Sequence, residues 1–122
     1  MADKKKILIV DDNTSYLDIL SINLKSAGFD VVGISDGLEA VFKAKQEKPD
    51  LIILDLMLPH MDGHKVCRFI KHDRQLQNIP IVIITSRDTQ EDSDKAKEGG
   101  ADGFLTKPTT IDTILSEINK HI

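Results

Sequence analysis

The chain has 122 residues, of which 40% are hydrophobic and 30% charged, and its formal net charge at pH 7 is −4. This length and balance are typical of one globular domain, placed here over residues 1–122, and the negative charge argues against nonspecific binding to nucleic acid or to an anionic membrane. The only cysteine, Cys67, excludes an intrachain disulfide and indicates a reducing compartment. The first apolar run, residues 7–10, is too short for a signal peptide or a membrane span, so we expect a cytoplasmic protein.

Short apolar runs alternate along the chain with amphipathic stretches. The runs at residues 7–10, 51–54 and 81–84 are almost free of polar residues, which is typical of strands buried on both faces. Weaker strand patterns cover residues 29–35 and 102–105. Because helical patterns separate the strands, the sequence predicts an α/β fold with a five-stranded parallel sheet covered on both faces and right-handed crossovers.

Turn and capping residues delimit five predicted helices. The helices follow Asn13 or Thr14, Asp36-Gly37, Asp62-Gly63, Ser86, and Thr109 or Thr110. On the second and third helices we expect Leu38, Phe42 and Phe69 to lie on or near the buried side. The fourth, over residues 87–100, has Ala96 as almost its only apolar residue, so we expect it to be marginal and mobile.

Polar residues follow four of the five predicted strands. They are Asp11 and Asp12 after the first strand, Asp55 after the third, Thr85 at the end of the fourth and Lys107 after the fifth. The second strand contributes no comparable group. Because the carboxyl ends of parallel strands meet at one edge of the sheet, we expect these side chains to converge.

This set of side chains fits a phosphoryl group. Clustered carboxylates repel one another unless a cation neutralises them, and Mg²⁺ prefers such oxygen ligands together with phosphate. Asp55 can act as a nucleophile that forms an aspartyl phosphate, while Lys107 and Thr85 bind the phosphoryl oxygens. Each residue alone also fits an ordinary role, as a turn former, helix cap or surface lysine, but their coincidence at four strand ends favours one phosphoryl site.

Four motifs closely resemble those of the receiver domains of two-component response regulators. They are ILIVDD at 7–12, LDLMLPHMDG at 54–63, ITS at 84–86 and GFLTKP at 103–108. The similarity covers essentially the whole chain. It implies a doubly wound, flavodoxin-like sheet with strand order 2-1-3-4-5 and five helices.

The resemblance also implies a reaction and its ligands. Asp55 would accept a phosphoryl group from the phosphohistidine of a sensor histidine kinase or a phosphotransfer protein. Asp12, Asp55 and the backbone carbonyl of Met57 would bind Mg²⁺ directly, and Asp11 would act mainly through water. The domain would promote its own phosphorylation and dephosphorylation but turn over no external substrate.

A conformational switch is the third implication of the resemblance. Lys107 and Thr85 would bind the phosphoryl oxygens, and the Lys107–Pro108 bond would be cis. Phe104 would swing inward as Thr85 moves, although plain core packing of Phe104 stays an alternative. The fourth helix, fifth strand and fifth helix would then bind an unknown output protein or domain, without direct contact to nucleic acid.

Three other functions compete with this interpretation. An aspartyl-phosphate hydrolase needs a second acid two residues after the nucleophile, where this chain has Met57. A flavodoxin-like electron carrier needs a Ser/Thr-rich phosphate loop after the first strand, which is missing. A constitutive scaffold would not need the complete set of acceptor, metal, threonine and lysine positions.

The remaining chemically distinctive residues receive no functional role. The histidines show no metal-ligand spacing and are expected on the surface or in loops; they are His60, His64, His72 and His121. Arg87 stands where several members of the family have an acid, so no phosphoryl lifetime is predicted. The predicted elements end with the fifth helix, which fits either a stand-alone regulator or part of a longer protein.

Overall fold

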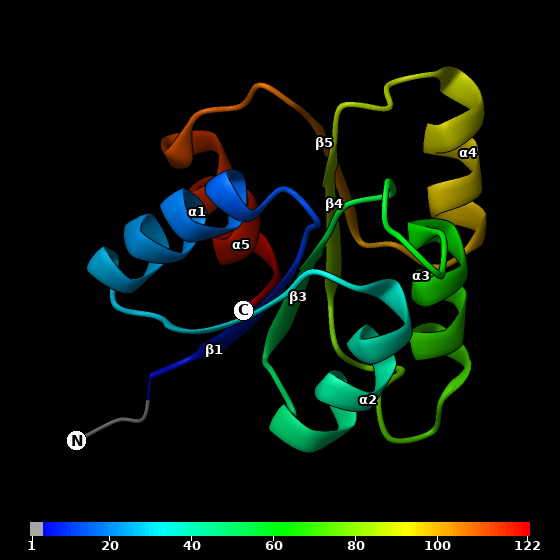
Figure 1. Cartoon of the computed structure of the whole chain (residues 1–122), viewed down its shortest axis with the longest axis horizontal. Helices are drawn as coiled ribbons and strands as arrows, with labels where there is room; N and C mark the ends of the chain where they lie inside the picture. Colours follow the sequence, from blue (N-terminus) through cyan, green and yellow to red (C-terminus); the bar gives the residue numbers. More distant parts are fainter. Residues whose placement is uncertain (1–3) are drawn as a thin grey trace.

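The computed structural model describes residues 4–122, in which five strands and five helices alternate (Figure 1). The domain predicted from the sequence begins at residue 1, so its first three residues lie outside the part that the structure describes. The strands are β1 (Lys6–Val10), β2 (Asp30–Ile34), β3 (Leu51–Leu54), β4 (Ile81–Thr85) and β5 (Gly103–Thr106). The helices are α1 (Thr14–Ser26), α2 (Gly37–Glu47), α3 (Gly63–His72), α4 (Gln90–Glu98) and α5 (Ile111–His121). The sheet is parallel with order β2-β1-β3-β4-β5, which confirms the predicted fold class.

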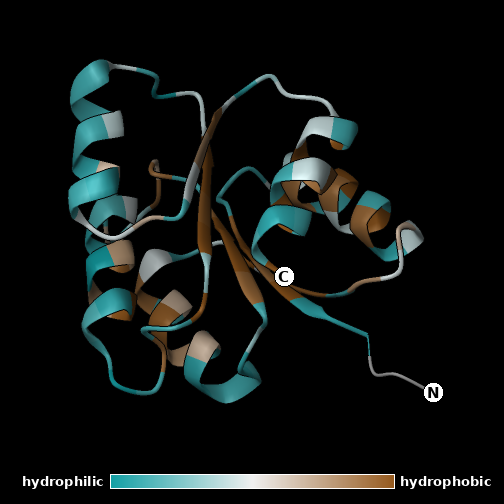
Figure 2. Ribbon diagram, turned by 180° about the vertical axis from the view of Figure 1, so that it is seen from behind, coloured by the Kyte–Doolittle hydropathy of each residue, from teal (hydrophilic) through white to brown (hydrophobic). Residues whose placement is uncertain are grey.

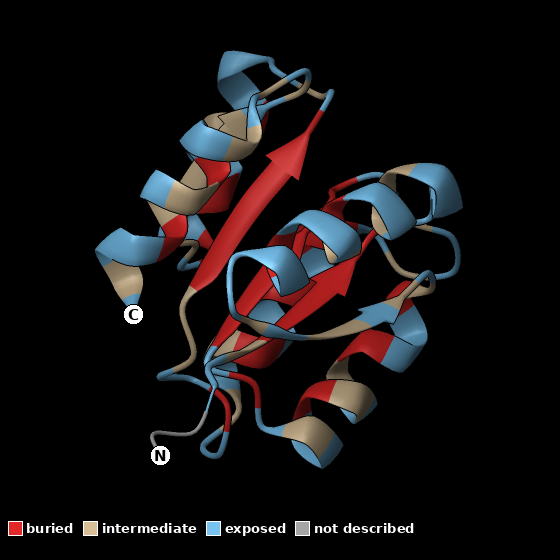
Figure 3. Cartoon of the chain, turned by 90° about the vertical axis from the view of Figure 1, so that its left-hand side faces the viewer, coloured by how far each residue is buried: buried red, intermediate tan, exposed pale blue. Residues whose placement is uncertain are grey.

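Helices cover both faces of the sheet, α1 and α5 on one side and α2, α3 and α4 on the other (Figure 1). Successive residues of each central strand point to opposite faces, so Leu8 and Val10 join the core under α2–α4 while Ile7 and Ile9 join the core under α1 and α5. The three central strands are buried along their whole apolar length (Figure 3). This double burial explains why their sequences lack an alternating polar pattern.

Side-chain caps set where the helices begin. Asn13 accepts a hydrogen bond from the Tyr16 amide at 3.0 Å and starts α1, and Thr110 accepts one from the Thr113 amide at 3.1 Å and starts α5. The fourth helix begins at Gln90, later than predicted, because the Thr89 hydroxyl caps it by accepting from the Asp92 amide at 3.1 Å. Residues 87–89 therefore form a loop that leads away from β4.

Three apolar side chains that we expected on buried helix faces are exposed. Leu38 and Phe42 on α2 are 56% and 70% exposed, and Phe69 on α3 is 53% exposed. Each helix contacts the sheet through a narrower stripe, which α2 makes from its buried alanines at 40 and 44 and the partly buried Val41. In Figure 2 the outer sides of these helices are mainly teal, and α4 is hydrophilic over most of its length. No helix within residues 4–122 is long and apolar enough to cross a membrane.

Candidate functional site at the carboxyl edge of the sheet

Asp11 and Asp55 lie side by side where β1 and β3 end. The last residues of these strands, Val10 and Leu54, are paired, and the Asp55 amide donates to the Val10 carbonyl at 2.9 Å. The Asp11 amide donates to the carbonyl of Ile34, the last residue of β2, at 3.0 Å. Both residues are almost fully buried, at 2% and 5% exposure. Two acids remote in sequence therefore share one edge, as the parallel topology requires.

Lys107 joins the two carboxylates. Its Nζ lies 2.7 Å from Asp11 Oδ2 and 2.9 Å from Asp55 Oδ2. Its backbone amide donates to the Thr85 carbonyl at 2.8 Å, which continues the pairing of β4 and β5 by one residue. The Lys107–Pro108 peptide bond is cis, as the family resemblance implied.

Thr85 and a backbone amide hold the other oxygen of Asp55. Thr85 is completely buried, and its hydroxyl donates to Asp55 Oδ1 at 2.8 Å. The amide of Met57 donates to the same oxygen at 3.0 Å. Each Asp55 oxygen thus has a donor, and the carboxylate is fixed in orientation by groups from three different segments.

Burial and ion pairing act against each other at this site. Burial raises the pKa of Asp11, and the hydrogen bond from Lys107 offsets part of that rise. Burial works to lower the pKa of Lys107, but the hydrogen bonds to Asp11 and Asp55 outweigh it and raise this pKa. Lys107 is therefore an ammonium at neutral pH, and its single charge is shared between two buried acids.

Tyr16 is a member of the site that sequence analysis missed. The Lys107 Nζ lies 3.9 Å from the centroid of the Tyr16 ring, within the range of a cation–π contact. The Tyr16 hydroxyl is buried without a hydrogen-bond partner among the described residues, and burial raises its pKa. Its place one turn after Asp12 puts it on the helix that leaves the acidic edge, but nothing in the sequence indicates its contact with Lys107.

Asp12 completes the acidic set from a more open position. It is exposed, and its carboxylate forms no hydrogen bond or ion pair with any residue in the described part of the chain. Asp11, Asp12 and Asp55 carry three negative charges against the one positive charge of Lys107, so two remain uncompensated. Residues 4–122 contain no group of three or more His, Cys, Asp or Glu able to hold a metal ion by themselves. Mg²⁺ needs only one or two carboxylates besides carbonyl and water oxygens, and its charge matches the deficit.

A second polar network lies beside the site and links the β4–α4 loop to α3 and α4. Arg87 contacts Asp62 at 3.1 Å and Asp92 at 2.7 Å. Asp92 lies 3.1 Å from Nε2 of His64 and accepts a hydrogen bond from the Thr89 hydroxyl at 2.8 Å. The expectation that His64 lies on the surface or in a loop was wrong: it is on α3 and only 5% exposed, because its partner Asp92 comes from a helix 28 residues further along the chain.

The contacts of Asp92 in this network should make the stability of the fold depend on pH in the acid range. The hydrogen bonds from His64, Thr89 and Arg87 lower the pKa of Asp92 to about 2. Since the folded-state pKa lies below that of the unfolded chain, ionised Asp92 stabilises the fold above pH 4 or so, and this contribution disappears as the pH falls toward 2. We expect Asp92→Asn to lower the free energy of unfolding by about 2 kcal/mol at pH 7, and by roughly half as much at pH 3.

Urea unfolding at both pH values measures this difference. Asp94→Asn is the matched control, since Asp94 is exposed on the same helix and, among the described residues, accepts a side-chain hydrogen bond only from Gln90. It should change stability by less than about 0.5 kcal/mol. An Asp92→Asn deficit that stays constant with pH would show that the carboxylate charge is not what stabilises this network.

Comparisons with known proteins agree on one family. Residues 7–119 match the model of the response regulator receiver domain. The chain is 46% identical over 104 residues, 85% of its length, to the alkaline phosphatase synthesis transcriptional regulatory protein PhoP of Bacillus subtilis, and 40% identical over 93% of its length to the DNA-binding dual master transcriptional regulator RpaA of Synechocystis. It covers 42% and 47% of these relatives, so it spans less than half of their length.

Solved structures show the same similarity. The chemotaxis protein CheY4 of Vibrio cholerae is 32% identical with a TM-score of 0.92, and the match covers 98% of this chain and 100% of that one. The BeF3-activated receiver domain of RstA from Klebsiella pneumoniae is 32% identical with a TM-score of 0.90, and the match covers 96% and 97% of the two chains.

Proposed function

Because the chain belongs to the response regulator receiver domain family, we propose that it accepts a phosphoryl group on Asp55 from a histidine kinase or a phosphotransfer protein. The observation that carries this proposal is the set of donors around the Asp55 carboxylate. Lys107, Thr85 and the Met57 amide all lie within 3.0 Å of its two oxygens. The same donors can hold phosphoryl oxygens after transfer, so the acceptor stays oriented before and after the reaction.

Asp12, Asp55 and the backbone carbonyl of Met57 would hold Mg²⁺, with Asp11 acting through water. The bound ion would neutralise the carboxylates and allow an anionic donor to approach them. The charge balance of the site supports this assignment, since two negative charges lack a partner. Lys107 provides the remaining compensation and keeps the two buried acids together.

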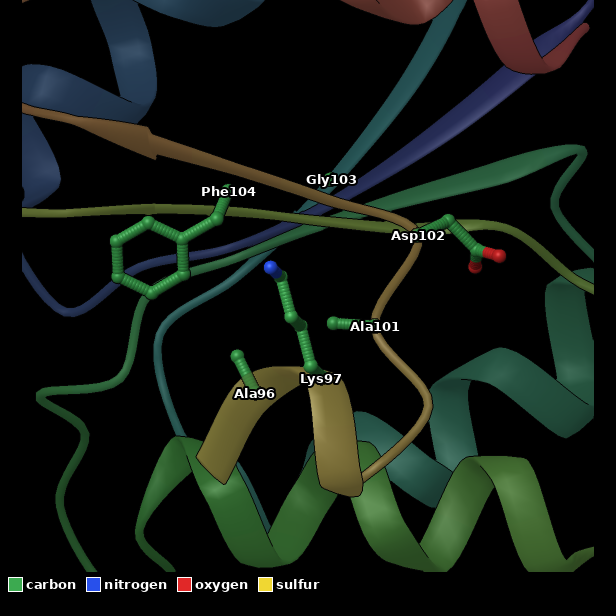
Figure 4. Close-up of a pocket in the computed structure, with 6 residues that line it drawn as sticks. All are labelled: Ala96, Lys97, Ala101, Asp102, Gly103 and Phe104. Carbon is green, nitrogen blue, oxygen red and sulfur yellow. The ribbon is translucent and has the colours of Figure 1, made fainter. Parts of the chain in front are cut away.

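The surface formed by α4, β5 and α5 would respond to phosphorylation through Thr85 and Phe104. Thr85 already contacts Asp55, and Phe104 lies on the neighbouring strand with only partial burial. Next to Phe104 a hollow of about 120 Å³ separates β5 from α4, and Figure 4 shows Ala96 and Lys97 rising from α4 beside it. Since only Asp92 and Ala96 of α4 are buried, this helix has little apolar contact to lose when it moves.

The chain would act as a phosphorylation-controlled binding module whose only chemistry is its own phosphorylation and dephosphorylation. Met57, two residues after Asp55, is half exposed and carries no acid, which disfavours an aspartyl-phosphate hydrolase. We propose that residues 1–122 form a single receiver domain without a nucleic-acid site of its own. A relative such as RpaA, described as DNA-binding, is more than twice as long as the matched part.

Incubation with acetyl phosphate and Mg²⁺ tests the proposal. We expect intact-mass spectrometry to detect one phosphoryl group on the wild-type chain and none on Asp55→Asn. Removal of Mg²⁺ with a chelator should reduce incorporation to roughly a tenth or less, because two uncompensated charges would then repel the donor. Asp18→Asn, an exposed change on α1, is the control and should leave incorporation unchanged. Equal incorporation in wild type and Asp55→Asn would contradict the assignment.

A further inference from the structure

A groove on the α3 side of the molecule is lined by none of the phosphoryl-site residues. It has a volume of about 600 Å³. Its walls include Leu38, Asp62, His64, Lys65, Arg68 and Arg87, together with residues of the β3–α3 loop and of α4. These come from the start of α2, the β3–α3 loop, α3, the β4–α4 loop and α4.

The groove is strongly cationic in a protein of net negative charge. Two lysines and two arginines line it, against the single carboxylate of Asp62. Arg87 is compensated by Asp62 and Asp92, but Lys65 and Arg68 form no ion pair with any residue from 4 to 122. These two like charges are three residues apart on α3, a spacing that brings side chains together and disfavours the helix unless an anion binds between them.

The wall of the groove also contains a buried polar atom without a partner. His64 is only 5% exposed; its Nε2 lies 3.1 Å from Asp92 Oδ1, while its Nδ1 has no hydrogen-bond partner in the described chain. Buried ring nitrogens are rarely left unsatisfied. The groove wall therefore contains one unsatisfied polar group besides its basic side chains.

The shape of the surface favours an extended peptide over a compact anion. A second hollow of about 300 Å³, lined by Lys65, Arg68, Phe69 and His72, adjoins the groove through its two shared basic residues. Positions 65 to 72 extend about 10 Å along α3. Phe69 and Leu38 are 53% and 56% exposed, so each presents an apolar contact next to the basic residues.

We propose that this groove binds an acidic segment of a partner protein. Lys65 and Arg68 pair with its carboxylates, and Phe69 contacts an apolar side chain of the same segment. We choose an acidic partner because of charge complementarity. An acidic segment supplies the negative charges that Lys65 and Arg68 do not find among the described residues of this chain. The groove is separate from Asp55, so this binding does not depend on the proposed phosphoryl transfer.

NMR of the ¹⁵N-labelled chain tests the proposal with a short synthetic peptide of glutamates flanking a central leucine. We expect the largest amide shifts on α3 and around Lys95, and weaker binding as salt rises above about 0.15 M. The double variant Lys65→Glu/Arg68→Glu should weaken binding at least roughly tenfold. The control Lys4→Glu/Lys5→Glu reverses two exposed N-terminal lysines and gives the same net charge.

Three results would overturn the proposal. Equal weakening by both double variants would indicate nonspecific charge attraction. Full binding by Lys65→Glu/Arg68→Glu would place the peptide elsewhere. If pyrophosphate shifts the α3 amide signals and the peptide does not, the groove is a site for small phosphates instead. Circular dichroism of both variants confirms that they are folded, and the phosphorylation assay of Asp55 reports separately on the proposed function.

Discussion

Lys107→Met is expected to destabilise the fold at pH 7 by about 3 kcal/mol, because it leaves the buried carboxylates of Asp11 and Asp55 without their shared cation. Methionine keeps most of the apolar stem, so the loss is one of charge rather than volume. The raised pKa of Lys107 means that its stabilising contribution is complete at neutral pH and is lost only as the solution becomes strongly alkaline.

The deficit of Lys107→Met should shrink as the pH falls. Burial already raises the pKa of Asp11, and without Lys107 only the hydrogen bond from the Asn13 amide still opposes that rise. The folded variant then binds protons more readily than its unfolded chain, so acid stabilises it relative to the wild type. Urea unfolding at pH 7 and pH 5, with a chelator present so that no divalent cation replaces the ammonium, measures this trend.

Lys25→Met is the control for this experiment, since Lys25 is exposed and forms no ion pair in the described chain. It should change the free energy of unfolding by less than about 0.5 kcal/mol at either pH. A Lys107→Met variant as stable as the wild type at pH 7 would mean that the two carboxylates tolerate burial without a cation. That result would contradict the charge balance proposed for the site.

Gly63→Ala is expected to disturb both stability and phosphoryl acceptance. A Cβ at position 63 would collide with the backbone carbonyl oxygen of Asp55 and would lie 2.5 Å from the Cα of Leu56. Both obstacles are backbone atoms, so the segment that carries Asp55, the proposed acceptor, must shift. We expect a loss of about 3 kcal/mol in the free energy of unfolding and at least a roughly tenfold slower reaction with acetyl phosphate.

Gly99→Ala is the matched control. Its Cβ would lie no closer than 3.3 Å to a neighbour, and the residue has ordinary helical backbone angles at the end of α4. Urea unfolding and intact-mass spectrometry of both variants provide the comparison. A Gly63→Ala variant with wild-type stability and reaction rate would show that the Asp55–Leu56 segment accommodates the methyl group, so that the close approach of α3 does not position the acceptor.

The fold could be predicted because burial on both faces leaves a simple sequence pattern. The predicted strands at 7–10 and 51–54 agree with β1 and β3 to within one residue, since every side chain in these runs faces a core. Parallel topology then brings the strand ends together, so the proximity of Asp11 and Asp55 followed from the sequence. The structure adds how Lys107 bridges them, at 2.7 and 2.9 Å.

Features that depend on tertiary geometry could not be predicted in the same way. An apolar residue on a helix indicates a buried face only when the helix packs over a wide arc, and the narrow contacts of α2 and α3 leave Phe42 and Phe69 in solvent. His64 is buried because α4 brings Asp92 to it. Tyr16 meets Lys107 across 91 positions of sequence, and no local pattern encodes that contact.

Locating the phosphoryl group is the most direct test of the central claim, that the carboxyl ends of β1, β3, β4 and β5 form one phosphoryl-accepting site. The chain is treated with acetyl phosphate and Mg²⁺, the acyl phosphate is reduced with borohydride to homoserine, and the product is mapped by tandem mass spectrometry. We predict homoserine at position 55 and at no other aspartate. Modification confined to another residue, or none on a folded chain, would contradict the account.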